Sequence, residues 1–218
     1  MPLSDQTRVE IREIIAKYPE PRSALLPMLH LVQSEEGMVS TAGIEMCAEE
    51  LGLTSAEVAS VATFYTMYKR RPVGKHLIGV CVNPQCGILG GDKLWETLTE
   101  ELGVDNDETT EDGEFSVERI ECQAACTYAP AVTVDWEFMD NMDPDKLRET
   151  LAKLRAGEEV VSTRGAVIRD FCATERTLAG LDDGLADSGD NNADEIMLAG
   201  LTYAKENGMS APLPGGDE

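Results

Sequence analysis

Apolar residues recur every three or four positions along the first 70 residues of the chain, and charged residues fill the positions between them. This spacing is typical of amphipathic helices that bury one face. The last of the expected helices opens with Thr54 and Glu57, the spacing of a capping box in which the two residues satisfy each other's backbone N–H groups. The expected helices lie at residues 5–18, 22–37, 40–52 and 54–71, and residues 71–74 form the hinge that ends this unit.

From residue 75 onward the pattern changes to short apolar or alternating runs, which are typical of strands. Longer segments with leucines at helical spacing lie between them and predict helices. The expected strands are 76–82, 115–122 and two within 131–140, and the expected helices are 91–103 and 143–158. The order β-α-β-β-β-α over about 80 residues predicts a small α/β sandwich.

After residue 160 the periodic signal fades. Residues 182–195 are acidic and rich in glycine and asparagine, a composition that favours disorder. The pentapeptides TLAGL (177–181) and MLAGL (197–201) echo each other, and we interpret them as two short apolar anchors on either side of a flexible linker. We therefore expect an α+β protein with a helical bundle at 1–72, an α/β domain at 73–160 and a largely irregular acidic extension at 161–218, partly disordered or bound to a partner.

Charge and hydropathy narrow the possible partners and the compartment. The chain has 41 acidic against 18 basic residues, for a net charge of −23, so it repels nucleic acid and anionic lipid, and we expect neither as a direct partner. No apolar run approaches the roughly 18 residues of a membrane span, and the N-terminus lacks the apolar centre of a signal peptide. We expect a soluble protein of the cytoplasm with no membrane span.

Four of the six cysteines form two close pairs, C-x4-C and C-x3-C, and each pair follows a predicted strand. Such loops can meet at one end of a sheet, where four thiolates suit either a tetrahedral zinc ion or a [2Fe–2S] cluster. The wide spacings and the lack of a C-x-x-C dithiol favour the cluster, and small residues at Gly87, Ala124 and Ala125 would let backbone N–H groups approach its sulfurs. Zinc and four unrelated core cysteines remain the alternatives. The candidate ligands are Cys81, Cys86, Cys122 and Cys126.

The other reactive residues have simpler interpretations. Cys47 and Cys172 are expected to be packed residues. Nothing in the sequence assigns His30 or His76 to a metal site or a catalytic site. Three aromatic residues of the last N-terminal helix belong either to the core or to a docking surface: Phe64, Tyr65 and Tyr68. Because residues 87–92 do not match G-x-G-x-x-G and no phosphate-binding loop is present, any nucleotide must be bound by another chain.

Residues 4–158 resemble the small [2Fe–2S] subunit of the NADH-oxidising module of respiratory complex I. The resemblance is carried by SALLPMLHLVQSEEG, ATFYTMY, CVNPQC, ECQAACTYAPAV and DPDKLRETL. It implies a thioredoxin-like ferredoxin domain behind the helices, a cis proline at Pro130, one iron on Cys81 and Cys86 and the other on Cys122 and Cys126. The chain departs from the family at residues 88–90, ILG in place of a run such as Leu-Arg-Gly, and at Ala124, near which a glycine is common.

The resemblance also implies a function. The chain would exchange single electrons with the flavin of a partner subunit that oxidises NADH, within an NADH:quinone oxidoreductase that is peripheral to the cytoplasmic membrane. FMN and NADH would lie on that partner, further iron–sulfur subunits would adjoin it, and the chain would have no complete active site of its own. The alternatives are the equivalent subunit of an NAD-linked hydrogenase or formate dehydrogenase, a zinc-stapled interaction module, and a diffusible ferredoxin, which would not need the helical unit.

Overall fold

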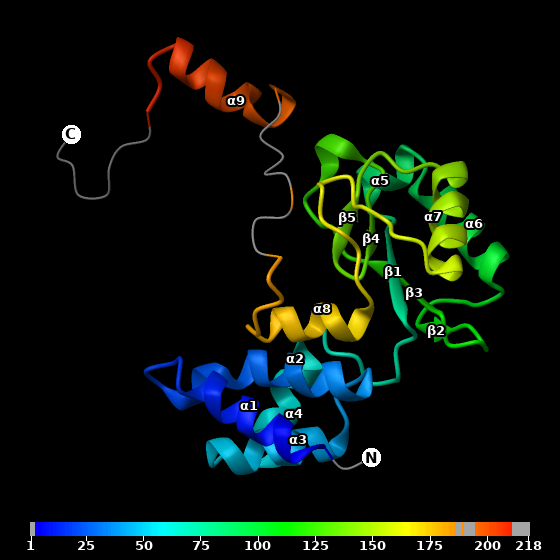
Figure 1. Ribbon diagram of the computed structural model, residues 1–218. Coiled ribbons are helices and arrows are strands. Elements are labelled where there is room, and N and C mark those ends of the chain that lie inside the picture. The colour runs from blue at the N-terminus through cyan, green and yellow to red at the C-terminus, as the bar shows by residue number, and fades with distance from the viewer. Residues whose placement is uncertain (1–2, 186–188, 190–194, 211–218) are drawn as a thin grey trace.

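Hydroxyl side chains set the start of most helices in the first third of the molecule. The computed structural model describes residues 3–185, 189 and 195–210 (Figure 1). The side chains of Ser4, Ser40 and Thr54 each accept a backbone N–H three residues on, and Thr54 forms the predicted capping box with Glu57. The resulting helices are α1 (Asp5–Ile15), α2 (Leu25–Glu36), α3 (Thr41–Leu51) and α4 (Ser55–Phe64), with a 3-10 turn, η1 (Pro21–Ala24), before α2. These confirm the predicted four-helix unit, but α4 ends at Phe64 and not at residue 71 as expected, because the chain becomes extended at Tyr65.

The helical unit has its own core, and α2 lies at its centre. Residues of α2 face α1, α3 and α4, so Met28, Leu29, Leu31 and Val32 are all fully buried. Because apolar residues cover most of its circumference, α2 is a buried helix and not a surface one. Gly43 of α3 lets that helix approach closely, since a Cβ there would lie 2.2 Å from Cγ1 of Val32.

A five-stranded mixed sheet forms the second unit, in the order β2-β3-β1-β4-β5. The strands are β1 (His76–Cys81), β2 (Glu108–Thr109), β3 (Phe115–Ile120), β4 (Val132–Val134) and β5 (Glu137–Met139). β1 runs parallel to β3 and antiparallel to β4. β4 and β5 are the predicted pair of short strands, joined at Asp135 and Trp136, both with positive φ. The two-residue β2 was not predicted.

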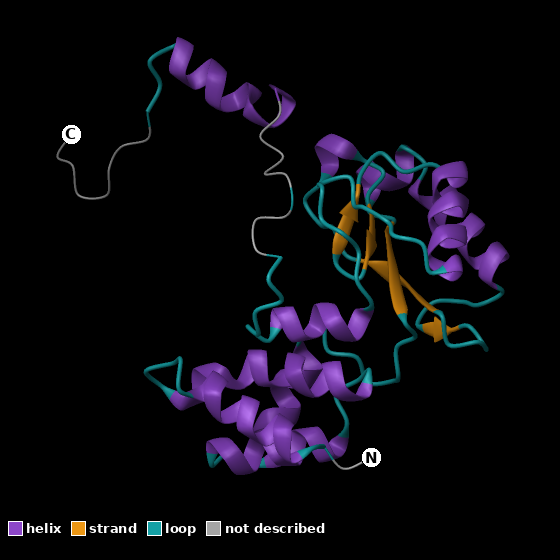
Figure 2. Cartoon of the chain, viewed as in Figure 1, coloured by secondary structure: helices purple, strands orange, loops and turns teal. Residues whose placement is uncertain are grey.

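The helices of this unit are α5 (Pro84–Ile88), α6 (Gly91–Leu102) and α7 (Pro144–Ala156), with a 3-10 turn, η2 (Cys126–Tyr128). α6 and α7 lie together on one face of the sheet (Figure 2). The leucines of α6 and α7, including Leu98 and Leu147, pack against β1, β3 and β4 in one core. Val160 and Ile168 belong to the same core. The predicted thioredoxin-like arrangement of helices on a mixed sheet is therefore present.

The C-terminal extension contains two helices that the sequence pattern did not predict, α8 (Phe171–Leu178) and α9 (Glu195–Glu206). α8 packs along α2, and Ala179 and Leu181 join the core of the helical unit, so the anchor predicted at 177–181 is confirmed. None of the residues of α9 is buried, and this helix holds the second expected anchor. The linker expected at 182–195 falls mostly outside the described residues. No helix in the described ranges is long and apolar enough to cross a membrane.

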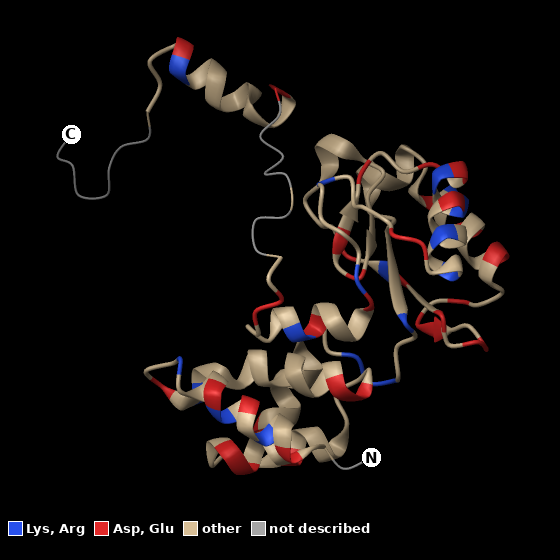
Figure 3. Ribbon diagram, in the orientation of Figure 1, with Lys and Arg blue, Asp and Glu red and all other residues tan. Residues whose placement is uncertain are grey.

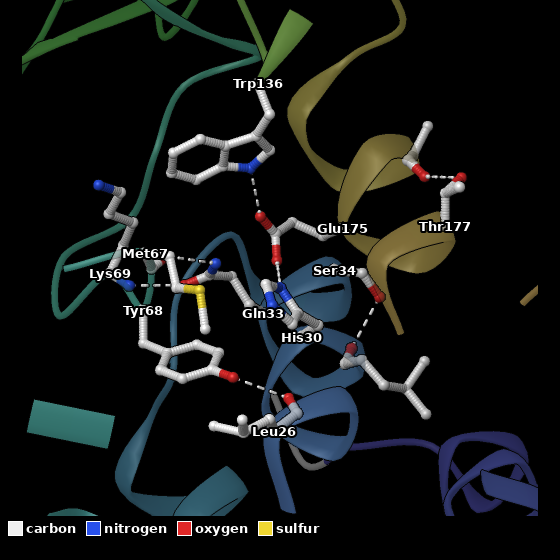
Figure 4. Close-up of polar contacts among 12 residues, drawn as sticks. Leu26, His30, Gln33, Ser34, Met67, Tyr68, Lys69, Trp136, Glu175 and Thr177 are labelled. Atoms are coloured by element: carbon white, nitrogen blue, oxygen red, sulfur yellow. Dashed lines mark hydrogen bonds and ion pairs between the residues drawn. The ribbon is translucent and has the colours of Figure 1, made fainter. Parts of the chain in front are cut away.

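Glu175 of α8 joins the two units. Its side chain is fully buried, and it pairs with His30 Nδ1 of α2 at 2.6 Å and accepts a hydrogen bond from Trp136 Nε1 of the β4–β5 turn at 2.8 Å (Figure 4). Nearby, the amide of Gln33 donates to Met67 O and accepts from the Lys69 N–H. Both histidines are therefore structural, as expected, since His76 similarly pairs with the buried Asp135 at 2.6 Å.

We expect Glu175→Ala to lower the free energy of unfolding by about 2 to 4 kcal/mol, because it leaves two donors without their acceptor. Glu175→Gln keeps one oxygen acceptor and should cost less. Urea unfolding of the full chain measures both, and Glu13→Ala, at an exposed carboxylate of α1, is the matched control. Equal unfolding midpoints for Glu175→Ala and Glu13→Ala would contradict the assignment of Glu175 as the link between units.

Candidate metal centre

The candidate ligands lie at one end of the sheet. Cys81 is the last residue of β1, and Cys86 lies on α5 immediately after it. Cys122 follows the end of β3, and Cys126 opens η2. Because β1 and β3 are parallel and Cys81 is in register with Ile120, both loops leave the sheet at the same edge. The predicted meeting of the two cysteine loops is thus confirmed.

The four thiols are arranged as two contacting pairs. Cys86 lies beside Cys81 and Cys126 lies beside Cys122, and both Cys86 and Cys126 also interact electrostatically across the pairs. All are free thiols. In the described part of the chain, no three His, Cys, Asp or Glu side chains converge as they would on a single metal ion. Two adjoining thiol pairs fit a [2Fe–2S] cluster, in which each iron takes two thiolates.

The two pairs differ in their exposure to solvent. Cys81 and Cys86 are 1% and 3% exposed, whereas Cys122 and Cys126 lie at the surface. Burial raises the pKa of Cys86 to about 11, against the opposing effect of the Ala131 N–H. The hydrogen bond with Cys122 raises the pKa of Cys126. These two thiols are therefore protonated in the metal-free chain, and metal binding has to displace their protons.

Polar contacts to the sulfurs differ from those expected. The Gly87 N–H donates to Asn83 O at 2.8 Å and so turns away from the sulfurs. Instead, the Asn83 side-chain amide lies 3.8 Å from Cys81 Sγ and also donates to Ile120 O, which ties the first cysteine loop to the end of β3. Asn83 was not singled out in the sequence; its place two residues after Cys81 was the available signal.

Backbone conformation shapes the second loop. Ala124 has a φ of 56°, in the left-handed region that glycine occupies most easily. The Ala129–Pro130 peptide bond is cis, as predicted.

Gly91, the first residue of α6, packs directly against the first loop. A Cβ at this position would lie 2.5 Å from Cys81 O and 2.9 Å from the carbonyl of Cys86. Only a residue without a side chain lets α6 start this close to Cys81 and Cys86, the two buried cysteines. The glycine therefore fixes the distance between the helix and the candidate ligands.

The two cysteines outside the loops and the three aromatic residues differ in their exposure to solvent. Cys47 is fully buried, as expected, and burial raises its pKa to about 12. Cys172 is half-buried, and burial raises its pKa as well. Tyr68 belongs to the core and donates its hydroxyl to Leu26 O, whereas Phe64 is 77% and Tyr65 40% exposed. Tyr68 therefore has the core role, whereas docking by Phe64 and Tyr65 stays a prediction.

We expect iodoacetamide to alkylate Cys122 and Cys126 of the metal-free chain at pH 8 much faster than Cys81 and Cys86. The outer thiols are exposed, and the raised pKa of Cys86 leaves only about one molecule in a thousand as the reactive thiolate at that pH. Raising the pH toward 11 should speed alkylation of Cys86. Timed peptide mass spectrometry measures each site, with buried Cys47 as a slow reference; equal rates at all four would contradict the described burial.

We expect Gly91→Ala to lower the free energy of unfolding by about 1 to 3 kcal/mol, because its Cβ meets backbone atoms that cannot rotate away. Gly200→Ala is the matched control, since nothing lies within 4 Å of a Cβ there. Urea unfolding of both variants gives the comparison. If Gly91→Ala were as stable as the unchanged chain, α6 would not be held against the cysteine loop as described.

Comparisons with known proteins agree with this geometry. Residues 11–155 match the family described as thioredoxin-like [2Fe-2S] ferredoxin. The chain is 51% identical over 211 residues to an NADH-quinone oxidoreductase subunit of Mycobacterium tuberculosis, covering 96% of this chain and 84% of that protein. It is 40% identical over 153 residues to an NADH-quinone oxidoreductase subunit of Thermus thermophilus, covering 69% of this chain and 84% of the other.

Among solved structures, an air-oxidized NAD+-reducing [NiFe]-hydrogenase aligns with a TM-score of 0.55 and 20% identity, over 61% of this chain and 23% of that chain. At this identity the likeness shows a shared fold. The match to the family covers both cysteine loops and most of the two folded units. The chain is therefore a member of the thioredoxin-like [2Fe-2S] ferredoxin family.

Proposed function

We propose that this chain is the [2Fe–2S] electron-transfer subunit of an NADH:quinone oxidoreductase, and that it exchanges single electrons with the flavin of an NADH-oxidising partner subunit. The observation that carries the proposal is the position of four free thiols, in two contacting pairs, at the shared edge of β1 and β3. The relatives that match the chain over most of its length are named as subunits of that kind of complex.

In this proposal the four cysteines hold the cluster, which supplies reversible one-electron chemistry when bound. Cys81 and Cys86 would hold one iron, and Cys122 and Cys126 would hold the other. The thiols of Cys81 and Cys86 are buried at the edge of the sheet, whereas those of Cys122 and Cys126 are exposed to solvent. The side of the chain that carries Cys122 and Cys126 is therefore the side that a flavin-bearing partner approaches.

The chain's own residues define what the partner must provide. Its sequence holds no dinucleotide fingerprint or phosphate-binding loop, so we assign FMN and NADH to the partner. We place the assembled subunit on the cytoplasmic side of the membrane, next to further iron–sulfur subunits. We also propose the division 1–72, 73–160 and 161–218 as helical domain, cluster domain and extension, the last bound to a partner over part of its length.

The equivalent subunit of an NAD-linked hydrogenase is the second candidate. Its support is the alignment with the NAD+-reducing [NiFe]-hydrogenase, which at 20% identity concerns the fold. The relatives at 51% and 40% identity both bear the quinone oxidoreductase name, which favours the first candidate.

Anaerobic reconstitution of the full chain with iron and sulfide tests the cluster. We expect two irons and two sulfides per chain and an EPR signal that appears after one-electron reduction, as for a [2Fe–2S] cluster with four thiolate ligands. Cys122→Ser should lower the iron content and change the EPR signal, whereas Cys172→Ser, at a half-buried thiol away from both loops, should leave both unchanged. Stoichiometric zinc without a reduced-cluster signal would overturn the proposal.

A further inference from the structure

The distribution of ion pairs singles out three arginines. Acidic residues outnumber basic ones 41 to 18, and most lysines and arginines accordingly pair with a carboxylate. Within the described residues, the basic side chains without such a pair are Lys17, Arg70, Arg71, Arg119 and Lys205. Lys17 donates to Gly180 O instead.

The three arginines line one cleft. It has a volume of about 530 Å³ and lies between the segment that links α4 to β1 and the edge of the sheet formed by β2 and β3. Figure 3 shows basic residues on that linking segment and acidic residues around β2, on the other side of the cleft. None of the four candidate ligand cysteines lines the cleft, so it is separate from the metal centre.

The charge inside the cleft is unbalanced. Glu118 is paired with Lys69 at 2.5 Å, so these two charges offset each other. Asp107 is the other carboxylate in the lining, against the exposed Arg70 and Arg71. Adjacent guanidinium groups repel each other, and this repulsion is relieved when an anion binds between them.

Arg70 and Arg71 are the arginines available to an anion, and both are exposed on the segment that links α4 to β1. The guanidinium of Arg119 lies instead over the Trp95 ring of α6 at 4.9 Å, and Trp95 is not part of the cleft lining. Because alternate residues of β3 face opposite sides of the sheet, Arg119 contributes its backbone to the cleft while Glu118 contributes its side chain.

The neighbouring residues favour a polypeptide as the anion. Phe64 and Tyr65, both exposed, directly precede Thr66, which lines the cleft. Exposed aromatic residues next to arginines are typical of the residues that dominate protein–protein interfaces. Asp107 would repel the concentrated charge of a phosphate group, whereas carboxylates along a peptide can be spaced to avoid it.

We propose that this cleft is the docking site for an acidic, carboxylate-rich segment of a neighbouring subunit. Phe64 and Tyr65 supply the apolar contact, and Arg70 and Arg71 bind the carboxylates. The site would explain why these two neighbouring arginines of so acidic a chain are left without partners of their own. The docking site does not depend on the cluster. The docking proposal can therefore fail while the proposed electron-transfer function holds, and that function can fail while the docking proposal holds.

Fluorescence anisotropy of the purified full chain with a labelled peptide of alternating glutamate and glycine tests the proposal. We expect binding that weakens as salt rises, because the contacts are electrostatic. Arg70→Glu/Arg71→Glu should weaken it by about tenfold or more. Lys93→Glu/Lys153→Glu changes the net charge equally, at exposed lysines of α6 and α7, and should bind as the unchanged chain does.

Equal loss of affinity in both double variants would overturn the proposal, because it would show a net-charge effect without a site. Absence of peptide binding would overturn the proposal that an acidic peptide occupies the cleft. Displacement of the peptide by an equimolar amount of inorganic tripolyphosphate would overturn it as well. Urea unfolding checks that each variant is folded. Arg70→Gln/Arg71→Gln, which removes charge without reversing it, replaces the first variant if that one unfolds, and should also weaken binding.

Discussion

The parallel pairing of β1 with β3 is the constraint on which the site depends. The cysteine loops are separated by 35 residues, among them all of α6, and nothing in either loop would bring them together on its own. A parallel ladder needs a crossover connection, and here α6 supplies it. Once His76 lies opposite Phe115, Cys81 must lie opposite Ile120, and both loops begin at one edge. Asn83 then fixes the first loop to the end of β3.

Around this pairing, the molecule places its buried charges where they join elements far apart in sequence. His76 of β1 and Asp135 of the β4–β5 turn form one such pair, and Asp135 also accepts the Leu77 N–H at 2.8 Å. His30 and Glu175 form the other, between the two units. Buried polar groups are strongly disfavoured unless each finds its partner, so these contacts select one arrangement of the units over alternatives of similar apolar packing.

Features encoded by local spacing were predictable from the sequence, and features that depend on distant partners were not. The Thr54 capping box, the β4–β5 turn and the pairing of the cysteines within each loop follow from residues a few positions apart. α8 was missed because a helix of only eight residues is too short to be stable by itself and is stabilised by packing on α2. The partner of His30 lies 145 residues away, so no local pattern could reveal it.

The position of Glu175 near the end of the chain has a consequence for biosynthesis. The ribosome releases the helical unit and the sheet before α8, because both precede it in sequence. Until α8 emerges, His30 and Trp136 lack the carboxylate that they share, and the two units are joined mainly by the linking segment. The nascent chain therefore acquires its final domain arrangement only after α8 has been synthesised. A chain truncated before residue 171 would retain the four candidate ligand cysteines but lose the contact that orients their domain.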